Sequence, residues 1–342
     1  MEQKIKFGTD GWRAVTDVDF TDENVKTAVN AVGKYVYETY GEGKKIIIGY
    51  DPRHKADYFA KMSSEILKEK GFNVLLSDRI VPTPVLAYNA KHLNACAIMF
   101  TASHNPPEYL GLKFIPDYAG PATKDITDKI MTNLTCDFQP FSDNGTVELT
   151  DFFTDYEENL SKIIDFKTIF NYFTQINAQK IIFDGLYSAT IGYFDKILEH
   201  NKIPFLSLHL YHDINFGGGM PEPKPQYLQE LVSKIKSSGN SLGFANDGDG
   251  DRFGIINELG EYVTPNEIIA ILLMHLRQNK NYEGALVKTV GASSMLNILA
   301  DKLGIEIIET AVGFKHVGEA MRKFNPIIAG EESGGLSIKN YI

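Results

Sequence analysis

The chain has 342 residues, enough for two or three domains that each bury a core, and 43% of them are hydrophobic, as in an ordinary globular protein. The net charge of -10 at pH 7 argues against general nucleic-acid binding, which needs a basic face, but allows an anionic substrate in a locally basic cleft. Two cysteines, no signal-peptide pattern and no apolar run long enough for a bilayer together predict a cytoplasmic protein without a membrane partner.

Helix and strand patterns alternate through the first third of the chain. Apolar residues at helical spacing, each run closed by a glycine, predict two helices: 25–36 and 59–67. Short apolar runs around them predict buried strands: 45–49, 74–76 and 94–101. The last strand leads directly into a polar loop.

The same strand, small-residue turn and helix recur twice further along. The second copy has a strand over 180–183 and a helix over 191–198, and the third has a strand over 285–287 and a helix over 295–299. Repetition at domain-length intervals predicts three consecutive α/β domains of similar topology, with mixed, mostly parallel sheets and helices on both faces.

Two polar, turn-rich segments suggest where the domains meet. Residues 139–151 fit the first join, and the turn at 257–260 fits the second. The predicted domains are therefore 1–145, 146–257 and 258–342.

Three aspartates that alternate with glycines, Asp247, Asp249 and Asp251, give the strongest chemical signal in the sequence. Carboxylates this close repel one another and raise one another's pKa, so they do not suit a core. A hard cation removes the conflict, and carboxylate oxygens suit Mg²⁺ or Ca²⁺. The intervening glycines let the backbone curl around one ion.

An EF-hand loop is the main alternative for these aspartates, because it also begins Asp-x-Asp-x-Asp and Glu258 falls at its twelfth position. Its sixth position requires glycine and is Arg252 here, and the flanking segments 241–245 and 253–257 have the pattern of strands rather than helices. A solvated acidic turn without an ion is the other alternative. We interpret the segment as a three-aspartate metal loop.

The segment 101–107 offers a nucleophile. Pro106 and Pro107 prevent a helix and hold Asn105 extended, so Ser103 is presented on a rigid loop at a strand end. His104 beside it can donate to a phosphate oxygen or move a proton. Alone, such a segment is more typical of a plain turn. It is interpreted as a nucleophile loop because the other motifs accompany it.

A phosphorylated Ser103 would need a cation and hydrogen-bond donors. The metal loop could supply the cation, and three basic residues could supply donors: Arg13, Lys113 and Arg252. Taken alone, each of these basic residues is more typical of a charged surface side chain. A further segment after an apolar strand, 330–335, places Glu331 and Ser333 between glycines. That pair could bind vicinal sugar hydroxyls, or form a polar turn.

Four segments in this order resemble the motifs of the α-D-phosphohexomutases, the family that includes phosphoglucomutase and phosphomannomutase. They are the N-terminal signature 7–13, the phosphoserine loop 101–106, the magnesium loop 247–252 and the sugar-binding loop 330–334. The resemblance is spread over the whole chain, which makes it far more specific than any one motif.

The resemblance implies a hexose phosphomutase acting on glucose or mannose phosphate. Phosphorylated Ser103 would give its phosphate to a hexose 1- or 6-phosphate, and the hexose 1,6-bisphosphate would return the other phosphate to Ser103. The implied Mg²⁺ ligands are Asp247, Asp249, Asp251 and Ser103. The implied catalytic residues are Ser103, His104, Lys113 and Arg13. The implied substrate contacts are Arg252, Lys315, Glu331 and Ser333.

Two departures from the family pattern matter. Gly335 stands where some members have His in a Ser-Gly-His motif, which leans away from the phosphoglucosamine mutases. The family's fourth domain, with a phosphate-binding loop, is absent from the 342 residues. We therefore expect these residues to bind metal but to hold the distal phosphate poorly, with low turnover.

Two other functions stay open. A phosphatase could use the aspartates directly, with an aspartate rather than Ser103 as the labelled group. A non-catalytic sugar-phosphate- or calcium-binding module would bind ligand without taking phosphate into the protein.

Overall fold

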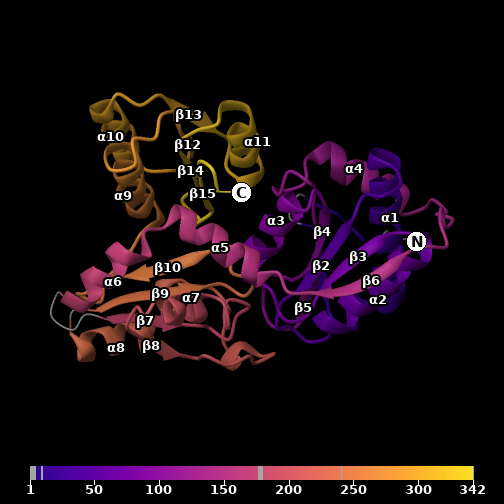
Figure 1. The fold of residues 1–342 in the computed structure, drawn as a ribbon, viewed down its shortest axis with the longest axis horizontal. Helices are drawn as coiled ribbons and strands as arrows, with labels where there is room; N and C mark the ends of the chain where they lie inside the picture. Colours follow the sequence, from indigo (N-terminus) through magenta and orange to yellow (C-terminus); the bar gives the residue numbers. More distant parts are fainter. Residues whose placement is uncertain (1–4, 9–10, 176–179, 240, 342) are drawn as a thin grey trace.

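A computed structural model describes residues 5–8, 11–175, 180–239 and 241–341. They form three sheets that follow one another along the chain, each covered by helices (Figure 1). This confirms the predicted three consecutive α/β domains with mixed sheets. Within the described part of the chain, no helix is both long and apolar enough to cross a membrane.

The first sheet has the strand order β1-β5-β4-β2-β3-β6. Its strands are β1 Trp12–Val15, β2 Ile46–Tyr50, β3 Asn73–Ser77, β4 Cys96–Phe100, β5 Tyr109–Ile115 and β6 Thr146–Thr150. Its helices are α1 Asp22–Tyr40, α2 Ala56–Lys70, α3 Thr83–His92 and α4 Lys124–Asn133. The strands β4, β2, β3 and β6 run parallel, whereas β5 and β1 pair antiparallel at one edge.

The second sheet has the order β11-β10-β9-β7-β8. Its strands are β7 Lys180–Asp184, β8 Phe205–Leu208, β9 Ser241–Asn246, β10 Phe253–Ile256 and β11 Tyr262–Val263. The helical segments of this region are α5 Phe153–Ile163, α6 Phe166–Gln175, α7 Phe194–His200, η1 Phe216–Gly218, η2 Pro225–Tyr227 and α8 Gln229–Ser238.

The third sheet has the order β13-β12-β14-β15. Its strands are β12 Leu286–Thr289, β13 Ile307–Thr310, β14 Ile328–Gly330 and β15 Leu336–Ile338. Its helices are α9 Pro265–Gln278, α10 Met295–Leu303 and α11 Phe314–Phe324.

All three sheets contain the same βαβαββ unit: three parallel strands joined by helices, then one antiparallel strand. The units are β2 to β5, β7 to β10 and β12 to β15. When the four strands of each unit are numbered along the chain, their order across the sheet is fourth, third, first, second; for the third sheet this order runs from β15 to β13. The turn between the third and fourth strands therefore lies at the carboxyl edge of the parallel strands in every unit, where α/β proteins place their ligands. Those turns are 101–108, 247–252 and 331–335.

Helices on both faces explain the continuous apolar runs in the strands. In β2, Ile46 and Ile48 pack in a cluster with α1 and α2, while Ile47 between them packs on the opposite face with Leu86 of α3 and Leu160 of α5. Alternate residues of a strand point to opposite faces, so both faces need apolar side chains when both are covered.

Two strands extend a sheet across the predicted domain boundaries. β6, which follows residue 145, pairs with β3 in the first sheet, and β11, which follows residue 257, pairs with β10 in the second. The chain thus adds the last strand of the first sheet, β6, directly before α5, which packs on that sheet.

Candidate active site

Ser103 lies in the turn between β4 and β5 and has a left-handed backbone, with φ of 52°. Only 3% of the residue is exposed. Its backbone N–H donates to Oγ1 of Thr101 across 2.7 Å. A left-handed conformation is uncommon for a residue with a side chain and needs support from its surroundings. The conformation of the loop at Ser103 is therefore held by its buried contacts.

The serine loop of the first sheet and the acidic loop of the second meet directly. Oγ of Ser103 donates to Oδ2 of Asp247 across 2.8 Å, although 144 positions separate the two residues. Each loop leaves the carboxyl end of its own parallel strands. The contact thus joins the two sheets at the edge where ligands bind in this class of fold.

The three aspartates of the acidic loop form one cluster, with a ligand oxygen of each within 4.8 Å of the others. Burial and the charges of Asp249 and Asp251 raise the pKa of Asp247 well above its ordinary value. Oδ1 of Asp249 is buried without a hydrogen-bond partner. Repelling, under-satisfied carboxylates of this kind fit a hard divalent cation with oxygen ligands.

Lys113 and Asp251 form a second link between the first sheet and the acidic loop. Nζ of Lys113, on β5, donates to Oδ2 of Asp251 across 2.9 Å. Burial alone would raise the pKa of Asp251, but the positive charges of Lys113, Arg252 and Arg13 together lower that pKa below its ordinary value. Lys113 of the first sheet thus helps to keep Asp251 of the acidic loop ionised.

His104 lies with its Nδ1 3.3 Å from Oγ of Ser103. Burial, followed by the charges of Arg252 and Arg13, lowers the pKa of His104 to about 4. At neutral pH the imidazole is therefore uncharged, and an uncharged ring can accept a proton from a neighbouring hydroxyl.

A cavity of about 510 Å³ opens beside the serine loop. It brings together residues from the first and third sheets and from the acidic loop of the second, including six of the predicted site residues: Arg13, Ser103, Lys113, Asp251, Arg252 and Glu331. Two arginines and a lysine are among these six. The cavity can therefore hold an anionic ligand against the serine.

Arg13 and Arg252 each have a carboxylate or amide partner at the cavity. Nη1 of Arg13 donates to Oδ1 of Asn105 across 2.8 Å, so the N-terminal segment is tied to the serine loop. Nη1 of Arg252 lies 3.9 Å from Oε1 of Glu222. In the N-terminal signature, Thr9 and Asp10 lie outside the described residues.

The sugar-loop residues are less closely assembled. Ser333 donates its hydroxyl hydrogen to Oε1 of Glu331 within the same loop. Glu331 lines the cavity, but among the described residues that line it neither Ser333 nor Lys315 is found. Lys315 is the second residue of α11, next to Phe314, which begins the helix and does line the cavity.

Two buried contacts at the site involve residues that the sequence patterns did not single out. Oγ1 of Thr83, at the start of α3, donates to Oδ2 of Asp249 across 2.6 Å. Arg53 donates to the backbone of the serine loop. Both residues follow strands of the first sheet, so their place at a carboxyl strand end was the available signal.

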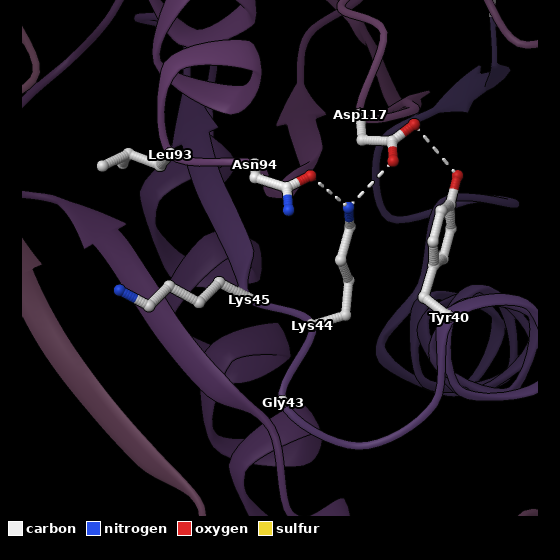
Figure 2. A pocket seen from close by; sticks show the side chains of 7 residues that line it. All are labelled: Tyr40, Gly43, Lys44, Lys45, Leu93, Asn94 and Asp117. Carbon is white, nitrogen blue, oxygen red and sulfur yellow. Dashed lines mark hydrogen bonds and ion pairs between the residues drawn. The ribbon is translucent and has the colours of Figure 1, made fainter.

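A separate pocket of about 480 Å³ lies at the opposite edge of the first sheet (Figure 2). There Nζ of Lys44 donates to Asn94 and Asp117, and the hydroxyl of Tyr40 donates to the same aspartate. Lys44 precedes β2 and Asn94 precedes β4, so this pocket is at the amino ends of the strands. It is distinct from the serine loop.

Comparison with protein families assigns the chain. Models described as phosphoglucomutase/phosphomannomutase alpha/beta/alpha domains I, II and III match residues 4–139, 154–260 and 264–342. The chain belongs to the phosphoglucomutase/phosphomannomutase family. This confirms the resemblance drawn from the four motifs.

Individual members of the phosphoglucomutase/phosphomannomutase family differ in the sugar named. A phosphoglucosamine mutase of Methanococcus maripaludis is 32% identical over 85% of this chain and 64% of its own length. A phosphoglucomutase/phosphomannomutase of Thermococcus kodakarensis is 28% identical over 98% of this chain and 73% of its own length.

A solved structure shares the arrangement of all three sheets. The crystal structure of a candidate phosphomannomutase from Thermus thermophilus superposes with a TM-score of 0.92 and 31% identity. It is matched over 100% of this chain and 77% of its own chain.

Proposed function

We propose that the chain is a hexose phosphomutase that interconverts hexose 1-phosphate and hexose 6-phosphate through a phosphoserine at position 103. The observation that carries the proposal is the 2.8 Å contact between Oγ of Ser103 and Asp247 of the acidic loop. It brings a nucleophile and a candidate metal cluster together in a cationic cavity. Family membership supports the reaction class.

Phosphate transfer moves one phosphoryl group in each half of the cycle. In the first half, the Oγ–P bond of Ser103 breaks, a P–O bond to the free sugar hydroxyl forms, and the product is a hexose 1,6-bisphosphate. In the second half, Oγ of Ser103 accepts the other phosphoryl group. Neutral His104, 3.3 Å from that oxygen, is placed to take up and return the proton.

The proposed metal site consists of Asp247, Asp249 and Asp251, with an oxygen of phosphorylated Ser103 as the fourth ligand. Mg²⁺ is the proposed ion, and when bound it would neutralise charge that develops on the transferred group. Lys113 and Arg13 would steady the equatorial phosphate oxygens by charge-assisted hydrogen bonds.

The proposed substrate contacts are Arg252, Lys315, Glu331 and Ser333. Glu331 and Ser333 would take the sugar hydroxyls, since a carboxylate accepts and a hydroxyl can do both. Substrate binding would have to redirect Ser333, because its hydroxyl bonds to Glu331 in the free loop. Arg252 and Lys315 would hold the phosphate that is not reacting.

Glucose and mannose phosphates are the proposed substrates, with the 1,6-bisphosphate as activator. Glucosamine phosphate is the second candidate, because relatives such as that of Methanococcus maripaludis are named phosphoglucosamine mutases. Gly335, which replaces the His of a Ser-Gly-His motif, favours the neutral sugars. Comparing kcat/KM for the three hexose 1-phosphates decides between them.

The proposed setting is the cytoplasm, and the proposed domains are 1–145, 146–257 and 258–342. Cys96 is buried and Cys136 is exposed, both as free thiols, which suits a reducing compartment. The pairing of β6 with β3 places a short strand of the second proposed domain in the first sheet.

The fate of the label separates a mutase from a phosphatase. Ser103 is first loaded with labelled phosphate from glucose 1,6-bisphosphate, and unlabelled glucose 1-phosphate is then added. We expect the label to move into the sugar bisphosphate, and the Ser103→Ala variant to take up no label. Release of the label mainly as inorganic phosphate, or loading of an aspartate, would support a phosphatase instead.

A further inference from the structure

The guanidinium group of Arg53 is buried beneath the serine loop, with 3% of the residue exposed. Nη2 donates to the carbonyl oxygens of Ser103 and Asn105 across 2.6 and 2.7 Å. Nη1 donates to those of Pro106 and Tyr109 across 2.7 and 3.0 Å. One side chain thus holds four backbone carbonyls along the turn from β4 to β5.

Asp51 orients this guanidinium and reaches the serine by a second route. Nε of Arg53 donates to Oδ2 of Asp51 across 3.2 Å. The hydroxyl of Thr101 donates to the same carboxylate oxygen across 2.7 Å, and its Oγ1 in turn accepts the backbone N–H of Ser103. The N–H and the C=O of Ser103 are therefore both tied to the Asp51–Arg53 pair.

Every N–H of the Arg53 guanidinium has an acceptor in this arrangement. The group carries five donors in a planar fork, and the five acceptors are Asp51 and the carbonyls of four loop residues. A lysine has three donors on one nitrogen and cannot match this geometry. The carbonyls need an arginine in particular, not only a positive charge.

Arg53 also contacts the second sheet's region. Its Cζ lies 5.0 Å from the ring centroid of Phe216, in the short helix η1. The ring is itself buried, with 3% exposure. A guanidinium over an aromatic face is attracted to it, so the group that shapes the serine loop is packed against the neighbouring domain.

We propose that Asp51, Arg53 and Thr101, here called the serine clamp, hold Ser103 in the conformation that reacts, with Arg53 as the positioning residue. The clamp fixes both backbone groups of a residue in the left-handed region, φ 52°, which sets the direction of Oγ. Arg53 is not among the described residues that line the cavity, and it bonds to the loop through backbone carbonyls alone. The proposal rests on the proposed phosphotransfer at Ser103.

The test is the rate at which Ser103 takes phosphate from glucose 1,6-bisphosphate, measured by rapid quench with Mg²⁺ present. We expect Arg53→Lys to fold and to lower the maximal labelling rate by about 10²-fold, because a small misplacement of a reacting group has that effect. The bisphosphate concentration at half-maximal rate should stay within about twofold, since no substrate contact is removed.

Arg79→Lys is the matched control, because Arg79 is a half-exposed arginine paired with Asp151 outside the site. It should label at the wild-type rate. If Arg53→Lys is less stable yet labels as fast as wild type and the control, the residue is structural only and the proposal fails.

Thr101 provides a second pair of variants that keeps the buried arginine. Thr101→Val is nearly isosteric but loses the hydroxyl that joins Asp51 to Ser103, and we expect labelling to slow about tenfold. Thr101→Ser keeps the hydroxyl and should restore the rate. Equal labelling rates in Thr101→Val and Thr101→Ser would overturn the clamp. This comparison remains decisive even if Arg53→Lys does not fold.

The wild-type result separates the two proposals. No label on Ser103 of the wild-type chain overturns the phosphotransfer function and the clamp together. If the wild-type chain takes up label and Arg53→Lys and Thr101→Val label at the wild-type rate, only the clamp is overturned.

Discussion

The serine loop and the sugar loop occupy equivalent turns of the repeated unit but are built very differently. Residues 101–103 of the serine loop are buried, and Ser103 bonds to Asp247 of another sheet's loop, a link that Lys113 of the adjoining strand β5 reinforces by bonding to Asp251. In the sugar loop, Ser333 bonds to Glu331 of the same loop. Chemistry needs fixed geometry, whereas the sugar loop, if it takes a sugar in two orientations as proposed, would benefit from groups that can change partners.

The contacts that join the second and third sheets to the rest of the molecule differ in the same way. Thr83 of α3 donates to Asp249 both through its hydroxyl, across 2.6 Å, and through its backbone N–H, across 2.8 Å. The third sheet is tied to α5 by the hydroxyls of Tyr156 and Tyr341, 2.6 Å apart. We infer that the junction of the first two sheets is the rigid part of the site.

Replacing a cluster aspartate should have the largest effect on the rigid junction. In Asp249→Asn, we expect mutase activity to fall by at least about 10²-fold, the scale of losing one strong electrostatic contact at a transition state. We also expect Mg²⁺ to raise the Tm of the wild-type chain, by binding only the folded state, and this rise to disappear in the variant. An unchanged Mg²⁺ shift in Tm would contradict the metal assignment.

The metal-free Asp249→Asn variant should be at least as stable as wild type at pH 7. Burial and the charge of Asp251 raise the pKa of Asp249 above its ordinary 3.8. A raised pKa means that the folded state disfavours the ionised form, so metal-free stability falls as the pH rises from the ordinary value through the raised one. The amide removes this loss. Thermal unfolding in EDTA measures the metal-free stability of both chains. A variant less stable than wild type at pH 7 would contradict the expectation.

Thr83→Val tests the contact between α3 and the acidic loop. The variant leaves the carboxylate of Asp249 without its hydroxyl donor, so we expect a loss of about 1–3 kcal/mol in the free energy of unfolding and weaker Mg²⁺ binding. Thr83→Ser is the control that keeps the donor. Urea unfolding of the two variants compares them, and equal stability would mean that this bond does not hold the junction.

Ser333→Ala should affect the adaptable loop in a different kinetic parameter. Loss of one neutral hydrogen bond to the sugar is worth about 1 kcal/mol, so KM should rise about fivefold while kcat changes little. Ser161→Ala, at an exposed serine of α5, serves as the control. A large fall in kcat at constant KM would place Ser333 in the chemistry and remove the contrast between the loops.

Tyr156→Phe should have the smallest effect. It removes one hydroxyl from the pair that ties the third sheet to α5, and we expect a loss of about 0.5–1.5 kcal/mol in the free energy of unfolding. In a double-mutant cycle with Tyr341→Phe, the two losses should not add, because both variants break the same bond. Full additivity would show that the hydroxyls do not interact.

Much of the fold followed from apolar patterns in the sequence. The runs at 45–49 and 94–101 predicted β2 and β4 because both faces of those strands are buried. The polar strand β6 gave no such signal, since most of its residues are exposed and only pairing with β3 places it in a sheet. The helix α5 was missed although Phe153, Tyr156 and Leu160 have helical spacing.

The candidate site was predictable where a motif carries its own chemistry. Alternating aspartates and the Ser103 loop stand out as sequences, whereas Arg53 and Thr83 look ordinary until strand pairing brings them beneath the motifs. The positions of Ser333 and Lys315 depend on side-chain direction in a turn and at a helix start. Spacing along the sequence does not determine that direction.

The most direct test of the account is the intact mass of the wild-type and Ser103→Ala chains after incubation with glucose 1,6-bisphosphate and Mg²⁺, followed by peptide mapping. We expect one added phosphate on the wild-type chain, located on Ser103, and none on the variant. A wild-type chain that gains no phosphate, or carries it on another residue, would contradict it.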